Sequence, residues 1–392
     1  MSIQGAVAAA ARKYEPYRGA LLALDFRRGE YWCEGRRYRE FGHVPGATFS
    51  RASTRYKETA AGLLIPVASG VPGITDKGLL VEEARTNLLT YSDTTIANLP
   101  SRDQVSDAGS PISGFTNSVA FGDNSVPRYG YKAGAHTNGT TYTLSVFVQM
   151  DDGGAPVPRN VNSAGDFGLV IFGNLSTLDP TVTQLGSTTT YRVSVSQVSA
   201  GAVTNHGVVK YTGQSARTFK VTGYQFEAGT FPTSYIPTTT ASATRAADVA
   251  TLAYAPTFPI SIVGSILPLS SPTAILVQVD DASTNNRVTL FRNTTSANAL
   301  AVAGGSVEAN VSRATVTTNT TYKHAARFAT NDVGASLNGG AVGTDTLAAM
   351  PTCTRIALGH NSAGGDFANG YIRTVVIYPS AFTDAQLAAA TA

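Results

Sequence analysis

Three adjacent pairs of acidic residues are the first groups in this chain that could carry out chemistry. They are Glu82–Glu83, Asp151–Asp152 and Asp280–Asp281. Enzymes that cleave glycosidic bonds use two carboxyl groups held roughly 5–10 Å apart across the substrate. Adjacent residues of a strand point to opposite faces, so no pair forms such a dyad by itself. We therefore expect the first pair to order a strand and the other two to lie in turns.

Other catalytic patterns are absent from the sequence. No G-x-S-x-G nucleophile motif occurs, and the five histidines lie in unrelated contexts. Neither a P-loop nor a dinucleotide-binding glycine pattern is present. These absences predict a protein that is not an enzyme and needs no organic cofactor. A catalytic pair assembled from residues far apart in the sequence is the alternative that stays open.

One polar segment could bind a structural calcium ion. Asp280, Asp281 and Asn285 would supply the carboxylate and carbonyl oxygens that calcium prefers. The same residues are also typical of a polar turn without a metal.

Exposed aromatic side chains flanked by hydrogen-bonding groups are the usual means of binding sugars. Tyr129 and Tyr131 alternate with Gly130, and residues two apart on a strand share a face. The pair is therefore a candidate carbohydrate-binding platform, with packing in a core or against another subunit as the alternative.

Positive charge is concentrated at the start of the chain. The first 60 residues hold eleven Lys and Arg against six Asp and Glu, whereas the whole chain has a formal net charge of +3. We expect this region to dock onto an acidic surface through Arg27, Arg28, Trp32, Arg36 and Arg37. An ordinary arginine-rich surface with local ion pairs is the alternative. The mixture with acids argues against nucleic-acid binding.

The elements that would position these residues are strands. Charged residues make up only 14% of the chain and apolar residues 43%. Thr141–Met150 alternates with period two over its whole length, which predicts a strand with a buried face. Leu21–Phe26 predicts a first strand, and Ser2–Ala11 a short Ala-rich helix. Thr383 and Gln386 have the spacing of a capping box for a C-terminal helix.

The fold class that follows is all-β, with two tandem antiparallel jelly-roll or β-sandwich domains after a small N-terminal head. The expected divisions are a basic attachment region at 1–50, a jelly roll at 51–240 and a second β-sandwich at 249–392. Cys33 and Cys353 are expected to be separate free thiols. No run of about 18 apolar residues predicts a membrane span. The N-terminal AVAAAA run lacks the basic region of a signal peptide.

Two phrases carry a resemblance to a known group of proteins. Ala47–Ser92 contains ATFSRAST and GLLVEEARTNLLTYS, and Tyr224–Val249 is YQFEAGTFPTSYIPTTTASATRAADV. Together they resemble a module of bacteriophage virion proteins, in which it frames a jelly roll similar to carbohydrate-binding modules. The segments TTYKHAARFATNDVGASLNGG and YIRTVVIYPSAFTDAQLAAATA resemble laminin-G/concanavalin-like sandwiches.

The resemblance implies a virion structural protein, a fibre or spike that is made in the bacterial cytoplasm. Its N-terminal region would attach to other virion proteins, in the capsid or the tail. Its β-sandwiches would bind host-surface polysaccharide. A homo-oligomer, most commonly a trimer, is implied, and membrane insertion is not. Two alternatives stay open: a capsid decoration or head-fibre protein without glycan binding, and a polysaccharide depolymerase.

Overall fold

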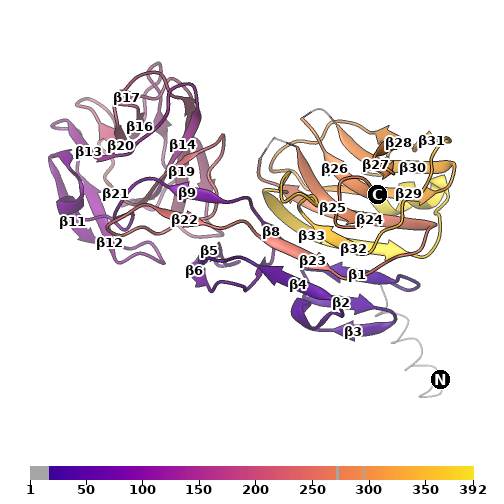
Figure 1. Cartoon of the computed structure of the whole chain (residues 1–392). Coiled ribbons are helices and arrows are strands. Elements are labelled where there is room, and N and C mark those ends of the chain that lie inside the picture. The colour runs from indigo at the N-terminus through magenta and orange to yellow at the C-terminus, as the bar shows by residue number, and fades with distance from the viewer. Residues whose placement is uncertain (1–16, 271–272, 295) are drawn as a thin grey trace, which may run out of the picture. The chain divides into compact units, whose positions relative to one another are not determined.

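The computed structural model describes residues 17–270, 273–294 and 296–392, and it is built almost entirely of antiparallel strands (Figure 1). The all-β fold class is thereby confirmed. One α-helix, α2 (Asp384–Thr391), lies in this described part of the chain, and the expected helix at Ser2–Ala11 falls outside it. The predicted capping box is confirmed, since the Thr383 hydroxyl accepts from the Gln386 N–H and the Gln386 side chain accepts from the Thr383 N–H.

The chain divides into two compact units, and each draws on separate stretches of sequence. Unit 1 combines the described residues up to Ser50 with Ile74–Glu83 and Asp248–Ala392, and unit 2 combines Arg51–Gly73 with Ala84–Ala247. The expected division into a head at 1–50, a jelly roll at 51–240 and a sandwich at 249–392 is therefore wrong in its first part. Residues up to Ser50 and the segment 74–83 belong with the C-terminal sandwich.

The reason is the hydrophobicity of the first strand. All four residues of β1 (Leu22–Asp25) are buried, and β1 pairs on one side with β2 (Glu30–Cys33) and on the other with β33 (Gly370–Tyr378). A strand buried on both faces is stable only in the interior of a sheet. The charged residues around β1 obscure this in the sequence.

Unit 1 is a sandwich of two large sheets. The first, with ten strands, runs β3-β2-β1-β33-β24-β29-β30-β31, and β8 joins β33 and β7. Its further bounds are β3 (Arg36–Tyr38), β24 (Ile260–Pro268), β29 (Tyr322–Ala329), β30 (Asp332–Leu337), β31 (Gly343–Asp345), β7 (Gly73–Thr75) and β8 (Gly78–Val81). The second, with seven strands, runs β28-β27-β26-β25-β32-β23-β4. Its bounds are β28 (Ser306–Ser312), β27 (Ala297–Ala303), β26 (Arg287–Arg292), β25 (Ala274–Asp280), β32 (Arg355–Leu358), β23 (Val249–Leu252) and β4 (Ala47–Ser50).

The inner faces of these sheets pack closely. Ile262 and Ile266 of β24 are fully buried, and the Leu276 side chain comes so near Gly264 that a Cβ there would lie 2.5 Å from it. Side chains at Val263 and Ser265 consequently point to the opposite, outer face of the ten-stranded sheet. Helix α2 packs against β29 and β30 of the same sheet.

Unit 2 has the two six-stranded sheets of a jelly-roll-like sandwich. One runs β11-β12-β21-β14-β19-β18 and the other β10-β13-β20-β16-β15, with β17 on β16. The first has β11 (Val105–Gly109), β12 (Asn117–Phe121), β21 (Phe219–Ala228), β14 (Thr141–Met150), β19 (Thr190–Val198) and β18 (Thr181–Gln184). The second has β10 (Ser101–Asp103), β13 (Arg128–Ala133), β20 (Asn205–Lys210), β16 (Phe167–Ile171), β15 (Pro158–Arg159) and β17 (Asn174–Leu175). The predicted strand at Thr141–Met150 is confirmed as β14 in the middle of the first sheet.

Two short pairings complete unit 2. They are β5 (Arg55–Glu58) with β6 (Leu64–Val67), and β9 (Arg85–Asn87) with β22 (Ala243–Arg245). Two single 3-10 turns also occur, η1 (Phe41–His43) in unit 1 and η2 (Ile96–Asn98) in unit 2. Within the described ranges, no helix is long and apolar enough to cross a membrane.

Within unit 2, the end of the first phrase of the phage resemblance contacts the second phrase through hydrogen bonds. The fully buried Asn87 donates to the carbonyls of Tyr224 (3.1 Å) and Ile236 (3.0 Å) and accepts from the N–H groups of Leu89 and Phe226. We name this buried network the clasp; its members are Asn87, Ser92, Gln225, Glu227, Thr233, Tyr235, Ile236 and Thr238.

The carboxylate of the clasp is used internally. Glu227 is 0% exposed and accepts from the N–H and the hydroxyl of Thr233 and from the Gln225 amide. A buried carboxylate with three donors stabilises the local fold. The most distinctive sequence motif therefore has a structural role.

Candidate functional site

The predicted tyrosine pair occupies an outer sheet face of unit 2. Tyr129 and Tyr131 of β13 are partly exposed, and their rings stack with centroids 4.9 Å apart and planes at 19°. Gly130 between them faces the core, since a Cβ there would meet Leu99 at 2.9 Å. The predicted shared face is confirmed, whereas the role in sugar binding stays a prediction.

Polar groups surround the two rings. On β10, Asp103 lies opposite Tyr129 and Ser101 lies opposite Tyr131. Burial, together with the neighbouring hydroxyls of Tyr211 and Tyr129, raises the pKa of Tyr131. The phenol is therefore neutral at physiological pH and can both donate and accept a hydrogen bond. We call Ser101, Asp103, Tyr129, Tyr131 and Tyr211 the tyrosine face.

This surface has the chemistry that sugar recognition needs. Its rings offer apolar planes, while a hydroxyl and an exposed carboxylate lie within one strand spacing of them. The Arg159 guanidinium lies over the Tyr211 ring at 5.7 Å, which extends the face toward β15.

The predicted attachment residues separate into two groups. Arg37 lies over the Trp32 ring at 5.4 Å and forms an ion pair with Glu30, and Arg36 is exposed on the same β2–β3 hairpin. Arg27 and Arg28 instead follow β1 and line a pocket. The sequence grouped the four arginines by their charge, which does not show where each side chain points.

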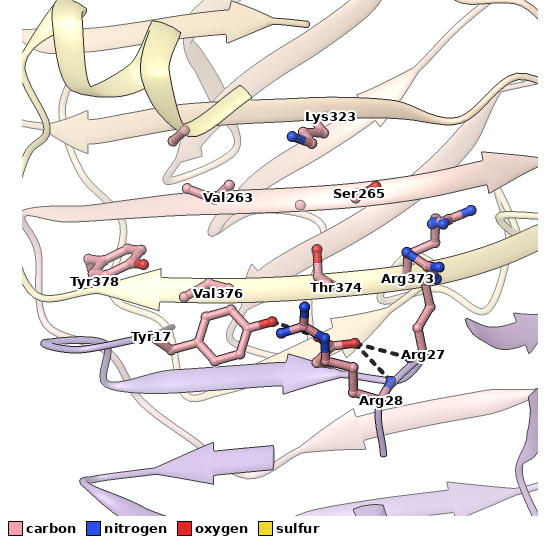
Figure 2. A pocket seen from close by; sticks show the side chains of 13 residues that line it. Tyr17, Arg27, Arg28, Val263, Ser265, Lys323, Arg373, Thr374, Val376 and Tyr378 are labelled. Atoms are coloured by element: carbon pink, nitrogen blue, oxygen red, sulfur yellow. Dashed lines mark hydrogen bonds and ion pairs between the residues drawn. The ribbon is translucent and has the colours of Figure 1, made fainter. Parts of the chain in front are cut away.

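The pocket has a volume of about 550 Å³ and lies on the outer face of the ten-stranded sheet (Figure 2). We call it the basic pocket. Its charged and hydroxyl-bearing lining residues are Tyr17, Asp25, Arg27, Arg28, Ser265, Lys323, Arg373, Thr374 and Tyr378. Its floor includes Val263 and Val376.

The strand register explains how distant residues meet in the basic pocket. Asp25, Thr374, Ser265 and Lys323 are successive cross-strand partners on β1, β33, β24 and β29. The pairing of β24 with β33 shifts at this point, which leaves Arg373 as an extra residue in a β-bulge. Bulges redirect side chains, and this one places Arg373 at the pocket (Figure 2).

Asp25 organises the turn that carries the two arginines. Its carboxylate, nearly buried, accepts from the Tyr17 hydroxyl at 2.7 Å and from the N–H groups of Arg27 and Arg28 at 3.1 Å. Burial and this bond to Asp25 raise the pKa of Tyr17. Figure 2 shows both arginine side chains beside the sheet surface.

The predicted calcium ligands form a polar turn. Asp280 is fully buried and accepts from the Arg355 Nε at 2.6 Å and from the Gln278 amide. Asp281 accepts from Ser283 and Asn286, and these bonds lower its pKa. The Asn285 N–H donates to Ser283. The turn alternative explains these contacts, and calcium binding stays a prediction.

The other acidic pairs are also held by the fold. Asp151 accepts from Thr218 and forms an ion pair with Lys220. Asp152 accepts two bonds from Arg217, which lower its pKa to about 2. Glu82 is buried, and its backbone N–H donates to the Asp248 carboxylate inside unit 1. Among the described residues, no cluster of three or more His, Cys, Asp or Glu could hold a metal ion.

Of the charged and hydroxyl-bearing residues that line the basic pocket, sequence reasoning proposed only Arg27 and Arg28 as binding residues, and it missed Tyr17, Asp25, Ser265, Lys323, Arg373, Thr374 and Tyr378. Their positions in the sequence give no local signal, because only the pairing of β1 with β33 brings the ends of the chain together. The irregular register at Arg373 also leaves no mark on its neighbours in the sequence.

Comparison with known proteins identifies a familiar domain in unit 1. Residues 266–388 match the family described as the Concanavalin A-like lectin/glucanases superfamily. This segment lies within unit 1 and covers less than half of the chain, so it assigns that domain alone. The expected laminin-G/concanavalin-like sandwich is confirmed there, and the family includes both lectins and enzymes. No curated protein matches the chain.

Several solved structures show a distant likeness. A heptameric SAP-like pentraxin from Limulus polyphemus matches with 12% identity and a TM-score of 0.28, covering 35% of this chain and 72% of the pentraxin. Domain 4 of the arabinanase AbnA from Geobacillus stearothermophilus matches with 18% identity and a TM-score of 0.31, covering 42% and 82%. Trypanosoma rangeli sialidase matches with 10% identity and a TM-score of 0.27, and only 25% of its length is covered.

Proposed function

We propose that this chain is a non-catalytic glycan-binding protein of a bacteriophage particle, and that its β-sandwiches bind host-surface polysaccharide. The concanavalin-like domain of unit 1 supports sugar binding as the general class of activity. The observation that carries the proposal is the tyrosine face, where two stacked and partly exposed rings adjoin hydroxyl and carboxylate groups.

Binding rather than hydrolysis is supported by the state of the carboxylates. The acidic groups Asp151, Asp152 and Asp280 are each neutralised by a basic side chain. A general acid needs a raised pKa and a nucleophile needs access to the sugar, whereas Arg217 lowers the pKa of Asp152.

The location on a virion is supported by the two phrases that resemble phage structural proteins. Attachment to capsid or tail proteins would use the N-terminal region, in which the exposed Arg36 and the Arg37–Trp32 pair occupy the β2–β3 hairpin. In a homotrimer, several weak sites would bind one polysaccharide at the same time, and this avidity would raise the overall affinity.

The test compares binding of the labelled full-length protein to whole host cells and to a glycan array. The double variant Tyr129→Ala/Tyr131→Ala should lose at least tenfold in affinity, because it removes both ring planes. Tyr129→Phe/Tyr131→Phe keeps the rings and should lose less. Tyr91→Ala removes an exposed tyrosine of the loop after β9 and should bind like the wild type.

Unchanged binding by the folded Ala double variant would refute the role of the tyrosine face. Binding to no glycan and no cell would favour the decoration or head-fibre alternative. Release of new reducing ends from host polysaccharide would show an enzyme. Electron cryomicroscopy of the purified virion tests the location, and absence of the chain from the particle would refute it.

A further inference from the structure

We propose that the basic pocket is a second ligand site, which binds one acidic sugar residue of a polysaccharide with its anionic group between Arg27 and Arg373. This inference goes beyond the proposed function, since it concerns a different unit and a charged ligand. It does not depend on the tyrosine face.

The charge balance of the pocket favours an anion. Four cationic side chains line it, from Arg27, Arg28, Lys323 and Arg373, against the single carboxylate of Asp25. That carboxylate already accepts from one hydroxyl and two backbone N–H groups, and its ion pair with Arg28 is long at 3.7 Å. The Arg28 side chain is 64% exposed, so it remains available to a ligand.

Arg27 and Arg373 are held near one another by the backbone. The N–H of Phe26, next to Arg27, donates to the Arg373 carbonyl at 3.0 Å, and the bulge turns the Arg373 side chain to the same side. Burial and the positive charge of Arg27 lower the pKa of Arg373. A bound anion would relieve this repulsion.

Each of the two guanidinium groups is held by one hydrogen bond. The Arg27 Nε donates to the Asp76 carbonyl at 3.4 Å, and one Nη of Arg373 donates to the Thr321 hydroxyl at 3.0 Å. The remaining N–H groups of each guanidinium are donors of the kind that bind a carboxylate or a sulfate in bidentate fashion. Lys323 also lines the pocket, and its ammonium group donates to a backbone oxygen of Ala392.

The rest of the pocket suits the sugar ring. Val263 and Val376 provide an apolar floor, and the hydroxyls of Ser265, Thr374 and Tyr378 lie along it (Figure 2). A volume of about 550 Å³ is within the range of small-ligand sites, roughly 300–1,000 Å³. The pocket is thus large enough for a sugar residue rather than only a bare ion.

The experiment measures binding of the full-length protein to three polymers at low salt by calorimetry: polygalacturonate, dextran sulfate and neutral dextran. Arg27→Gln/Arg373→Gln is compared with Arg39→Gln/Arg102→Gln, which removes the same charge from exposed positions outside the pocket. We expect the pocket variant to lose at least tenfold in affinity for an acidic polymer and the control variant to lose about twofold or less.

Preference for polygalacturonate would assign a carboxylate, and preference for dextran sulfate would assign a sulfate. Equal losses in the two variants would show general charge attraction and overturn the proposal. Binding to neither acidic polymer, or only to inorganic phosphate, would also overturn it. Tyr129→Ala/Tyr131→Ala should keep its affinity for the acidic polymer; if that affinity is lost, the glycan site is the tyrosine face alone. If the protein binds neutral glycans only, the proposed function stands and this inference fails.

Discussion

Replacing Asn87 by alanine tests whether the phage-like phrases act as a structural clasp. Asn87 makes four hydrogen bonds, two as donor and two as acceptor, and it is fully buried. The substitution leaves two carbonyls and two N–H groups of the backbone without these partners. At a net value of about 1 kcal/mol for each bond, we expect a loss of about 3–5 kcal/mol in the free energy of unfolding.

That loss is a large fraction of the roughly 5–15 kcal/mol that stabilises a typical domain. Urea-induced unfolding followed by circular dichroism measures it, and hydrogen exchange at the amides of Leu89 and Phe226 locates it. The control is Thr86→Ala on the same strand, where a solvent-exposed hydroxyl bond to Thr244 is lost. We expect about 0.5 kcal/mol or less for this control.

A cost of 1 kcal/mol or less for Asn87→Ala would refute the structural reading of the clasp. Normal stability together with lost glycan binding would instead make the phrase part of a ligand site. Both outcomes differ from the expected result, in which stability falls and the remaining folded protein still binds.

Three smaller predictions follow from buried or capping groups. Burial lowers the pKa of Lys132 from 10.5 to about 7, so between these pH values the unfolded chain binds more protons than the folded protein. The midpoint of urea unfolding should therefore rise with pH across this window in the wild type, and it should rise less in Lys132→Met. Cys33 and Cys353 are buried, and burial raises the pKa of Cys353 to about 12, so thiol reagents should react slowly with the native protein and quickly in urea. Thr383→Ala should cost about 1 kcal/mol by calorimetric unfolding, since it removes the N-cap of α2, whereas Thr383→Ser should cost less.

Local patterns predicted the elements well. The period-two alternation at Thr141–Met150 predicted a strand with the observed bounds, because successive side chains of a strand point to opposite faces of the sheet. The capping box at Thr383 was predictable for a similar reason, since all of its partners lie within one helical turn.

Long-range pairing was not predictable in the same way. The sequence indicated that Leu21–Phe26 is a strand but could not show that it pairs with Gly370–Tyr378. The expected boundary between residues 240 and 249 agrees with the crossing at Asp248, but the separate head and the continuous jelly roll were wrong, because the chain enters and leaves unit 2 twice and returns to unit 1 at 74–83.

The two candidate sites differ in the same way, since one depends on a local pattern and the other on long-range pairing. Tyr129 and Tyr131 could be paired from sequence, since both lie on one strand and share its face. The basic pocket could not be predicted from sequence, because its residues come from the neighbouring strands β1, β33, β24 and β29. In addition, Arg373 lies in a bulge, where the regular alternation of side chains is interrupted. Arg27 and Arg28 were chosen for their charge, and only the structure separates them from Arg36 and Arg37.

The distribution of polar groups explains why the recognisable motif and the candidate binding surfaces lie in different places. In the clasp, Asn87 and Glu227 have satisfied partners inside unit 2, so their polar atoms are not available to a ligand. A buried network of this kind constrains sequence strongly, because removing one member leaves the others unsatisfied. Tyr131 and Arg373 lie on outer sheet faces and take no part in this network. The clasp residues of the motif therefore stabilise the scaffold, whereas both proposed ligand sites consist of residues outside the two phrases.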